Sequence, residues 1–365
     1  MSSLYLYGIV GAQRLPVFKT EGLAGGLRVI FEGDVGAIAG AAPVENFQGL
    51  AREQAVRLLV NHQQVLEEAM AQTTVLPVKF GTVAPDERAV CRMLTQGGDL
   101  LGTRLAEFND RLQIEVVAQW RLDQVFAEIA TEAEVAELRQ TALSGGGTEA
   151  SLRLGQAVKT ALDRRRTALS AELYAELGTV ATDMTAHQPL NDHVALDVAV
   201  LLDRMDVGSL DGLLNRLDSK MAGQLNFRSI GPLPPMNFAT VEVTFPSRDA
   251  IHRACKTLEL GDRTSRQEIR SAYRRLACER YSGVLSLEVE DRDGGMGKLT
   301  EAYRTLMTYA QTSMPESADH DWIFDANATA DRVIINVVRQ EMNRAAAADE
   351  RLAGIFVSPR QDAVA

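Results

Sequence analysis

The chain has 365 residues, a length that predicts two or three domains. Its residues are 46% hydrophobic and 24% charged, a composition typical of a soluble globular protein. Its formal net charge of −11 argues against nucleic-acid binding, because phosphate backbones repel an acidic chain. Three cysteines at no ligand-like spacing argue against disulfides and favour a reducing cytoplasm, and no apolar run is long enough to span a membrane.

Residues 1–112 are predicted to form an N-terminal α+β domain. Runs of apolar residues with high strand propensity indicate strands, and apolar residues at helical spacing indicate amphipathic helices. The expected strands cover residues 4–10, 27–31, 35–39 and 75–81. The expected helices cover residues 53–71 and a segment that begins after Pro85, since proline suits the first turn of a helix.

Residues 113–248 are predicted to form a ferredoxin-like α+β domain with a long helical insertion. The expected strands cover residues 114–120, 194–202, 224–230 and 239–245. Two long helical patterns, broken at residues 144–148, which include three consecutive glycines, separate the first two strands, and a shorter helix precedes the third. This order can form an antiparallel sheet with helices on one face. Arg164, Arg165 and Arg166 are expected to be a solvated helix face, with binding of an acidic partner as the alternative.

The C-terminal third is predicted to contain a small helical unit at residues 249–312, followed by an acidic segment and a helix within residues 313–365. The helix is expected over residues 331–344, and its apolar stripe is too extensive to stand alone in water. We expect it to dock on the same chain, with docking on a partner as the alternative. The acidic residues before it make a basic face at Arg270, Arg274 and Arg275 the expected dock.

Enzyme signatures are missing from the sequence. The run GGMGKL at residues 294–299 lacks two of the positions that define a phosphate-binding loop. His187 and His193 have no cysteine nearby and only Asp192 as a neighbouring carboxylate, so a structural or solvent-exposed role is expected. The chain is therefore predicted to have no catalytic residues, no cofactor and no metal.

Two segments containing proline and glycine are the most specific motifs, LPVKFGTV at residues 76–83 and GPLPPMNF at 231–238. With the first strand, the first helix and the arginine-rich helix, they make residues 4–245 resemble the GvpF/GvpL family of gas vesicle proteins. Gas vesicles are cytoplasmic protein shells filled with gas. The resemblance implies a non-enzymatic assembly or minor structural protein of the cytoplasm, associated with the gas vesicle, that binds the shell subunit and other accessory proteins but neither membranes nor nucleic acids.

Residues 266–277 and 299–306 resemble the second and third helices of a J-domain. Their expected packing contacts are Ile269, Tyr273, Leu276, Ala302, Tyr303 and Leu306. At the position of that family's His-Pro-Asp signature the chain has Tyr281, Ser282 and Gly283, which implies that it does not stimulate a chaperone ATPase. The segment nevertheless carries a net positive charge, because residues 252–280 hold eight basic and four acidic residues.

These observations predict two partner-binding surfaces. One is the apolar segment that contains Leu76, Val78 and Phe80, which would cover the apolar surface of a shell subunit before assembly. The other is the basic face at Arg270, Arg274 and Arg275. The alternative function is that of a chaperone-system adaptor, whose J-like unit recruits a chaperone ATPase without stimulating it.

Overall fold

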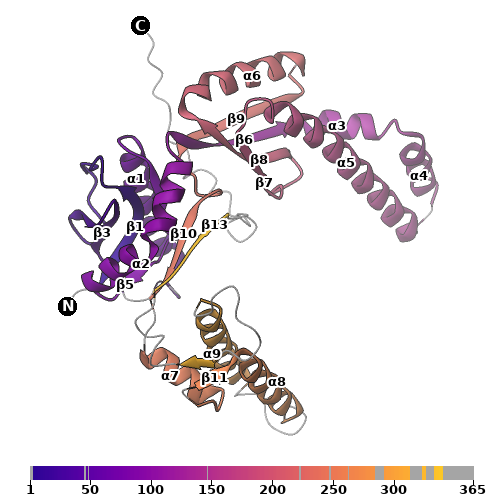
Figure 1. The fold of residues 1–365 in the computed structure, drawn as a ribbon. Helices are drawn as coiled ribbons and strands as arrows, with labels where there is room; N and C mark the ends of the chain where they lie inside the picture. Colours follow the sequence, from indigo (N-terminus) through magenta and orange to yellow (C-terminus); the bar gives the residue numbers. More distant parts are fainter. Residues whose placement is uncertain are drawn as a thin grey trace.

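The computed structural model shows an α+β protein with three groups of elements (Figure 1). It describes residues 3–339 apart from 45–46, 48, 146, 222, 246–247, 262, 284–291, 313–322 and 326–332. Most of the predicted acidic segment, including Asp319 and Asp321, and everything after residue 339 therefore lie outside the described residues.

The first unit is an antiparallel sheet with one helix on each face. Its strands, in sheet order, are β2 (Leu27–Glu32), β3 (Val35–Ala41), β1 (Leu4–Gly11) and β4 (Val75–Pro77), with β5 (Val83–Ala84) also paired to β1. Its helices are α1 (Arg52–Met70) and α2 (Glu87–Glu107). The central strand β1 is buried on both faces, because Tyr5 and Tyr7 join the core beneath α1 while Leu4 and Leu6 join the core beneath α2. This explains its unbroken apolar sequence.

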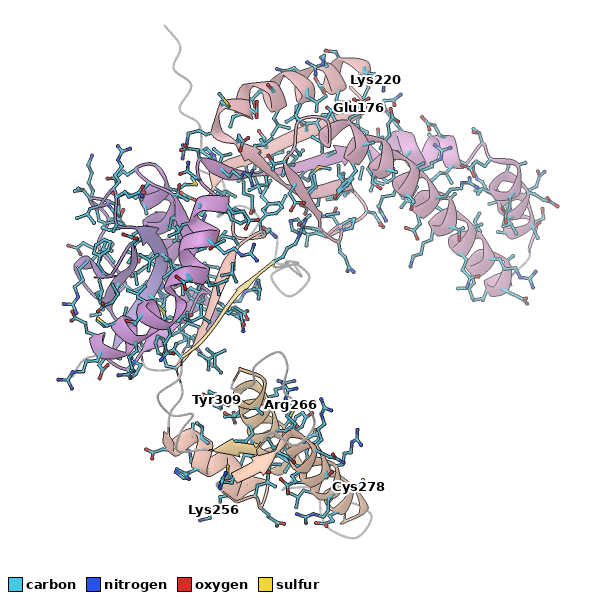
Figure 2. All side chains as sticks on the ribbon, in the orientation of Figure 1. Glu176, Lys220, Lys256, Arg266, Cys278 and Tyr309 are labelled. Atoms are coloured by element: carbon cyan, nitrogen blue, oxygen red, sulfur yellow. The ribbon has the colours of Figure 1, made fainter. Side chains whose placement is uncertain are left out.

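The second unit is a four-stranded antiparallel sheet with helices on one face. Its strands, in sheet order, are β7 (Asp183–Ala186), β8 (Val194–Asp203), β6 (Arg111–Trp120) and β9 (Leu225–Leu233). Its helices are α3 (Leu122–Ile129), α4 (Ala133–Leu143), α5 (Gly147–Leu177), the short η1 (Arg204–Asp206) and α6 (Val207–Lys220). The chain order β–α–β–β–α–β is that of a ferredoxin-like unit. Helices α5 and α6 lie side by side, with Lys220 Nζ 2.8 Å from Glu172 Oε1 and 3.8 Å from Glu176 Oε1 (Figure 2).

The predicted composition of the second sheet is wrong in one strand. Residues 239–245 do form a strand, β10 (Thr240–Thr244), but it does not join this sheet, whose edge position is taken by β7. Instead β10 lies against the first unit, where Val241 forms a parallel bridge with Val78 and accepts a hydrogen bond from Lys79 N at 2.9 Å. The domain limit predicted at residue 248 therefore assigns β10 to the wrong sheet.

The helix predicted over residues 331–344 is wrong for the part that the structure describes. Residues 334–338 form the strand β13 (Ile334–Val338), which pairs antiparallel with β10. Its isoleucines and valines are β-branched and favour an extended backbone that packs on both sides. The described strand β13 docks on the same chain, as expected of the tail, but it lies on β10 and α2 rather than on Arg270, Arg274 and Arg275.

The third unit is a small helical bundle with a two-stranded ribbon. Its elements are α7 (Arg248–Thr257), β11 (Arg263–Ser265), α8 (Arg266–Gly283), α9 (Arg292–Thr312) and β12 (Ile323–Asp325), the last paired antiparallel with β11. The predicted packing of α8 on α9 is confirmed, because Ile269, Leu276, Ala302 and Leu306 are buried together. The rings of Tyr273 and Tyr303 stack with centroids 4.4 Å apart. Tyr309 of α9 is also buried in this core, and burial raises its pKa (Figure 2).

Candidate functional site

The apolar segment predicted to bind a shell subunit is built into the first sheet. Leu76 and Val78 are 0% and 1% exposed, and Leu76 pairs with Ile9 of the central strand. Both side chains pack in the core beneath α2, and β10 bridges to the segment at Val78. The exposure expected of these two side chains is therefore wrong, since a partner would reach them only if the sheet opened.

Phe80 is half-buried and belongs to an aromatic cluster on the other side of the sheet. Its ring lies 5.4 Å from that of Phe47 and 5.7 Å from that of His62, and Tyr5 Oη lies 2.8 Å from His62 Nδ1. Burial lowers the pKa of His62 to about 4 and raises that of Tyr7 to about 12, so both rings are uncharged at neutral pH. Tyr5 Oη also accepts a hydrogen bond from Gly81 N. The cluster thus holds the LPVKFGTV segment in place.

The arginine cluster of α5 is engaged in ion pairs with neighbouring acidic residues. Arg165 binds Glu128 and Glu132 at the end of α3 and the start of α4, and its hydrogen bond lowers the pKa of Glu132. Arg166 lies 2.9 Å from Asp192. Its guanidinium also lies 5.7 Å from the centroid of the Trp120 ring. These contacts tie α5 to its neighbours, so an acidic partner would have to displace them.

The predicted basic face of the third unit is only partly available. Arg275 lies 2.8 Å from Glu259 and 3.4 Å from Glu279, which neutralise it. Arg270 and Arg274 are exposed on α8 and form no ion pair with any residue that the structure describes. A positively charged contact surface here is therefore limited to these two side chains.

An exposed apolar surface that the sequence analysis missed lies at the tip of the helical insertion. Leu143 at the end of α4 is 79% exposed, and Leu152 near the start of α5 is 62% exposed. Figure 1 shows that this helix pair projects away from the second sheet. Exposed large apolar side chains on a projecting element offer a partner an apolar contact. We call Leu143 and Leu152 the arm tip.

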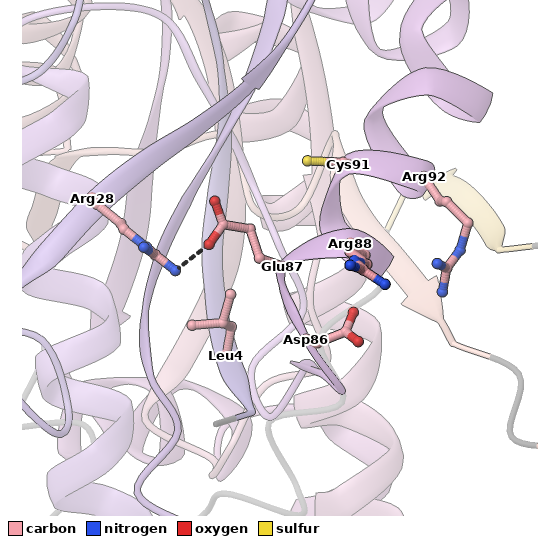
Figure 3. A pocket seen from close by; sticks show the side chains of 7 residues that line it. All are labelled: Leu4, Arg28, Asp86, Glu87, Arg88, Cys91 and Arg92. Carbon is pink, nitrogen blue, oxygen red and sulfur yellow. Dashed lines mark hydrogen bonds and ion pairs between the residues drawn. The ribbon is translucent and has the colours of Figure 1, made fainter. Parts of the chain in front are cut away.

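A hollow of about 650 Å³ lies beside the start of α2 (Figure 3). It is lined by Leu4, Arg28, Asp86, Glu87, Arg88, Cys91 and Arg92. Glu87 lies 2.8 Å from Arg28, and Asp86 caps α2 by accepting a hydrogen bond from Ala89 N at 2.8 Å. Burial, with the nearby Glu32, raises the pKa of the Cys91 thiol. The carboxylates of Asp86 and Glu87 in the hollow are thus already partnered, and the thiol of Cys91 is protonated. The hollow therefore lacks an activated nucleophile.

Comparison with known proteins places these features in a family. Residues 3–240 match the family model described as gas vesicle synthesis protein GvpL/GvpF. The chain belongs to the GvpL/GvpF family. It is 29% identical over 248 residues to gas vesicle protein F of a Streptomyces species, a match that covers 65% of this chain and 99% of that protein. Both predicted family motifs lie inside the matched residues, whereas the third unit lies beyond them.

Two crystal structures of GvpF support the fold of the matched part. The protein from Microcystis aeruginosa has a TM-score of 0.52 at 19% identity, and the match covers 65% of this chain and 99% of that one. The protein from an Anabaena species has a TM-score of 0.55 at 21% identity, with 64% and 97% covered. GvpL/GvpF membership supports a role in gas vesicle formation. Within the described residues, no helix combines the length and the apolar character that crossing a bilayer requires.

Proposed function

We propose that this GvpL/GvpF protein is a non-enzymatic gas vesicle assembly or minor structural protein of the cytoplasm that binds the shell subunit and other accessory proteins. The observation that carries the proposal is the family match, which spans both α+β units. An assembly factor must cover apolar surfaces of its client until the shell closes. It therefore needs exposed apolar side chains of its own, which Leu76 and Val78 do not provide.

We place the main contact with an apolar client at the arm tip. Leu143 and Leu152 are more than half exposed, and substitution there leaves the cores of the three units untouched. The helices that carry them are held by the ion pairs of Arg165, so the tip is presented on a braced element. Phe80 contributes indirectly, since it fixes the segment that supports the first sheet.

The test is affinity capture of the full-length protein from cells that make gas vesicles, with the bound proteins identified by mass spectrometry. The wild type should retain the shell subunit or accessory gas vesicle proteins. The double variant Leu143→Ser and Leu152→Ser should lose most of this binding, whereas Met205→Ser, at a position that is 86% exposed on η1, should keep it. Equal capture by all three proteins would exclude the arm tip as the contact. A wild type that captures no gas vesicle protein would refute the binding function itself.

A second candidate function, that of a chaperone-system adaptor, rests on the third unit. Its α8 and α9 pack as the J-like resemblance expects, and α8 exposes Arg270 and Arg274. Tyr281–Gly283 stand where the resemblance places the His-Pro-Asp signature, at the end of α8. We therefore propose recruitment of a chaperone ATPase without stimulation. Addition of the full-length protein should leave ATP turnover at its basal rate, and Arg270→Glu with Arg274→Glu should abolish chaperone capture. A several-fold stimulation would contradict this role.

A further inference from the structure

Three buried side chains converge on the face of the second sheet that its helices leave uncovered. Glu115 lies on β6, Asp197 lies on the neighbouring β8, and His187 follows β7. His187 N donates a hydrogen bond to Asp197 O at 2.8 Å, which extends the pairing of β7 with β8. One ligand atom from each of the three side chains lies within 4.8 Å of the others. The sheet thus brings one imidazole and two carboxylates to one point.

The His187 ring is enclosed without a hydrogen-bond partner. Its side chain is 0% exposed, and neither ring nitrogen has a hydrogen-bond partner among the residues that the structure describes. Nε2 lies 3.4 Å from Oε2 of Glu115, whose side chain is 4% exposed. Burial of an imidazole without a hydrogen-bond partner is costly. A metal ion at the point where the three side chains meet would give the His187 ring a partner.

The spacing and the surrounding hydrogen bonds fit a metal ion. In a tetrahedral zinc site with bonds of about 2.0–2.1 Å, two ligand atoms lie about 3.4 Å apart, which matches the separation of His187 Nε2 from Glu115 Oε2. The other oxygen of Glu115 accepts a hydrogen bond from Gln113 Nε2 at 2.5 Å. Gln113 is itself held by Asn237, whose backbone N donates to Gln113 Oε1 at 3.0 Å. Such outer partners orient the ligands of metal sites.

We propose that Glu115, His187 and Asp197 bind one divalent transition-metal ion of the zinc class. A donor set of imidazole and carboxylate favours zinc over magnesium or calcium, which prefer oxygen ligands alone. The ion joins side chains on or next to three adjacent strands, so it stabilises the sheet. This role goes beyond the proposed binding function, because the site is buried and does not contact the arm tip. It also revises the sequence analysis, which assigned no metal.

The experiment uses the full-length protein, stripped of metal with a chelator and titrated with Zn²⁺ against a chromophoric competitor. The wild type should bind one tightly held ion per chain, and Zn²⁺ should raise its Tm. His187→Gln and Asp197→Asn should bind that ion at least about 100-fold more weakly and lose the Tm shift, because each removes a direct ligand. The matched control is His193→Gln, an exposed histidine that should behave as wild type.

Titration of the wild type with Co²⁺ decides the question even if the buried variants do not fold. Absorption typical of nitrogen and oxygen ligands supports the site, whereas thiolate charge-transfer bands would place the ion on Cys91, Cys255 or Cys278 and overturn it. A folded wild type that takes up neither Zn²⁺ nor Co²⁺ would also overturn it. The three side chains would then form a metal-free buried cluster.

Discussion

The strand β13 lies between two hydrophobic cores, and substitutions on its two sides should therefore loosen different units. Ile334 is 2% exposed and packs in the core of α7, α8 and α9, whereas Ile335 packs against the core beneath α2. Ile334→Ala removes three carbon atoms, worth about 0.8 kcal/mol each, and leaves a cavity. We expect a total loss of about 2–5 kcal/mol, the range for such changes in a core.

Hydrogen exchange of the full-length protein, followed by mass spectrometry, should locate this loss. Ile334→Ala should accelerate exchange in the helices of the third unit and leave the central strands β1 and β6 protected. Ile335→Ala should instead affect α2 and its sheet. The matched control is Asn336→Ala, because Asn336 is exposed on the same strand. If Ile334→Ala leaves exchange in the third unit unchanged, β13 does not connect the two cores.

Four further substitutions test other features of the fold. Burial lowers the pKa of His62 to about 4, so the unfolded chain binds more protons between pH 6.5 and 4. The free energy of unfolding should therefore fall by about 3 kcal/mol as the pH drops through this range, and His62→Gln should abolish that slope in urea denaturation. A Cβ on Gly97 would lie 2.5 Å from Ile335 Cδ1, a side-chain end that must then shift, so Gly97→Ala should give a lower Tm than Gly98→Ala. Gly98→Ala meets nothing within 4 Å and should stabilise by up to about 1 kcal/mol, because alanine favours helix. Arg339 pairs with both carboxylate oxygens of Asp183, at 2.7 and 3.0 Å. Arg339→Lys should therefore lower the free energy of unfolding by up to about 1 kcal/mol and speed limited proteolysis of the tail. An unchanged cleavage rate would contradict this prediction.

The sequence predicts best where one local pattern decides the structure. The spacing of apolar residues gave α1 within one residue of its observed start and end. Pro85, Asp86 and Glu87, whose proline and acids suit a first turn, marked the start of α2, which begins at Glu87. The apolar run of β1 correctly indicated a buried strand, and the structure buries it on both faces.

The failures come from elements whose state depends on distant partners. The four residues of β7 include only one large apolar side chain, Met184, so they carry a weak strand signal, and pairing with β8 decides their conformation. Residues 333–338 show apolar residues that suit either an amphipathic helix or a strand buried on both sides. The strand forms because these residues pair with the edge of β10 and because Gly97 leaves room for the Ile335 side chain.

The candidate sites show the same dependence on tertiary structure. An apolar run such as Leu76 to Phe80 predicts burial or a contact surface equally well. In the structure, Leu76 and Val78 are buried because they pack beneath α2 and because β10 bridges to the segment. His187 lies far along the chain from Glu115, and it approaches Asp197 only because β7 pairs with β8. Without β7 in the predicted sheet, these three residues had no reason to be grouped. The exposed leucines of the arm tip resemble core positions of an amphipathic helix, so their exposure follows only from the shape of the helix pair.

The position of the third unit between β10 and β13 bears on how its function can be tested. The family match ends at residue 240, the first residue of β10, and β13 returns to pair with that same strand. The helical unit is thus inserted between two paired strands and is held at both ends, with Ile334 in its core. A truncation at residue 245 would remove β13 together with the helices and would uncover the apolar core beneath α2. Loss of function in such a truncation could not be assigned to the helices. Only a deletion that joins β10 to β13 by a short linker separates the contribution of the third unit from the stability of the GvpL/GvpF fold.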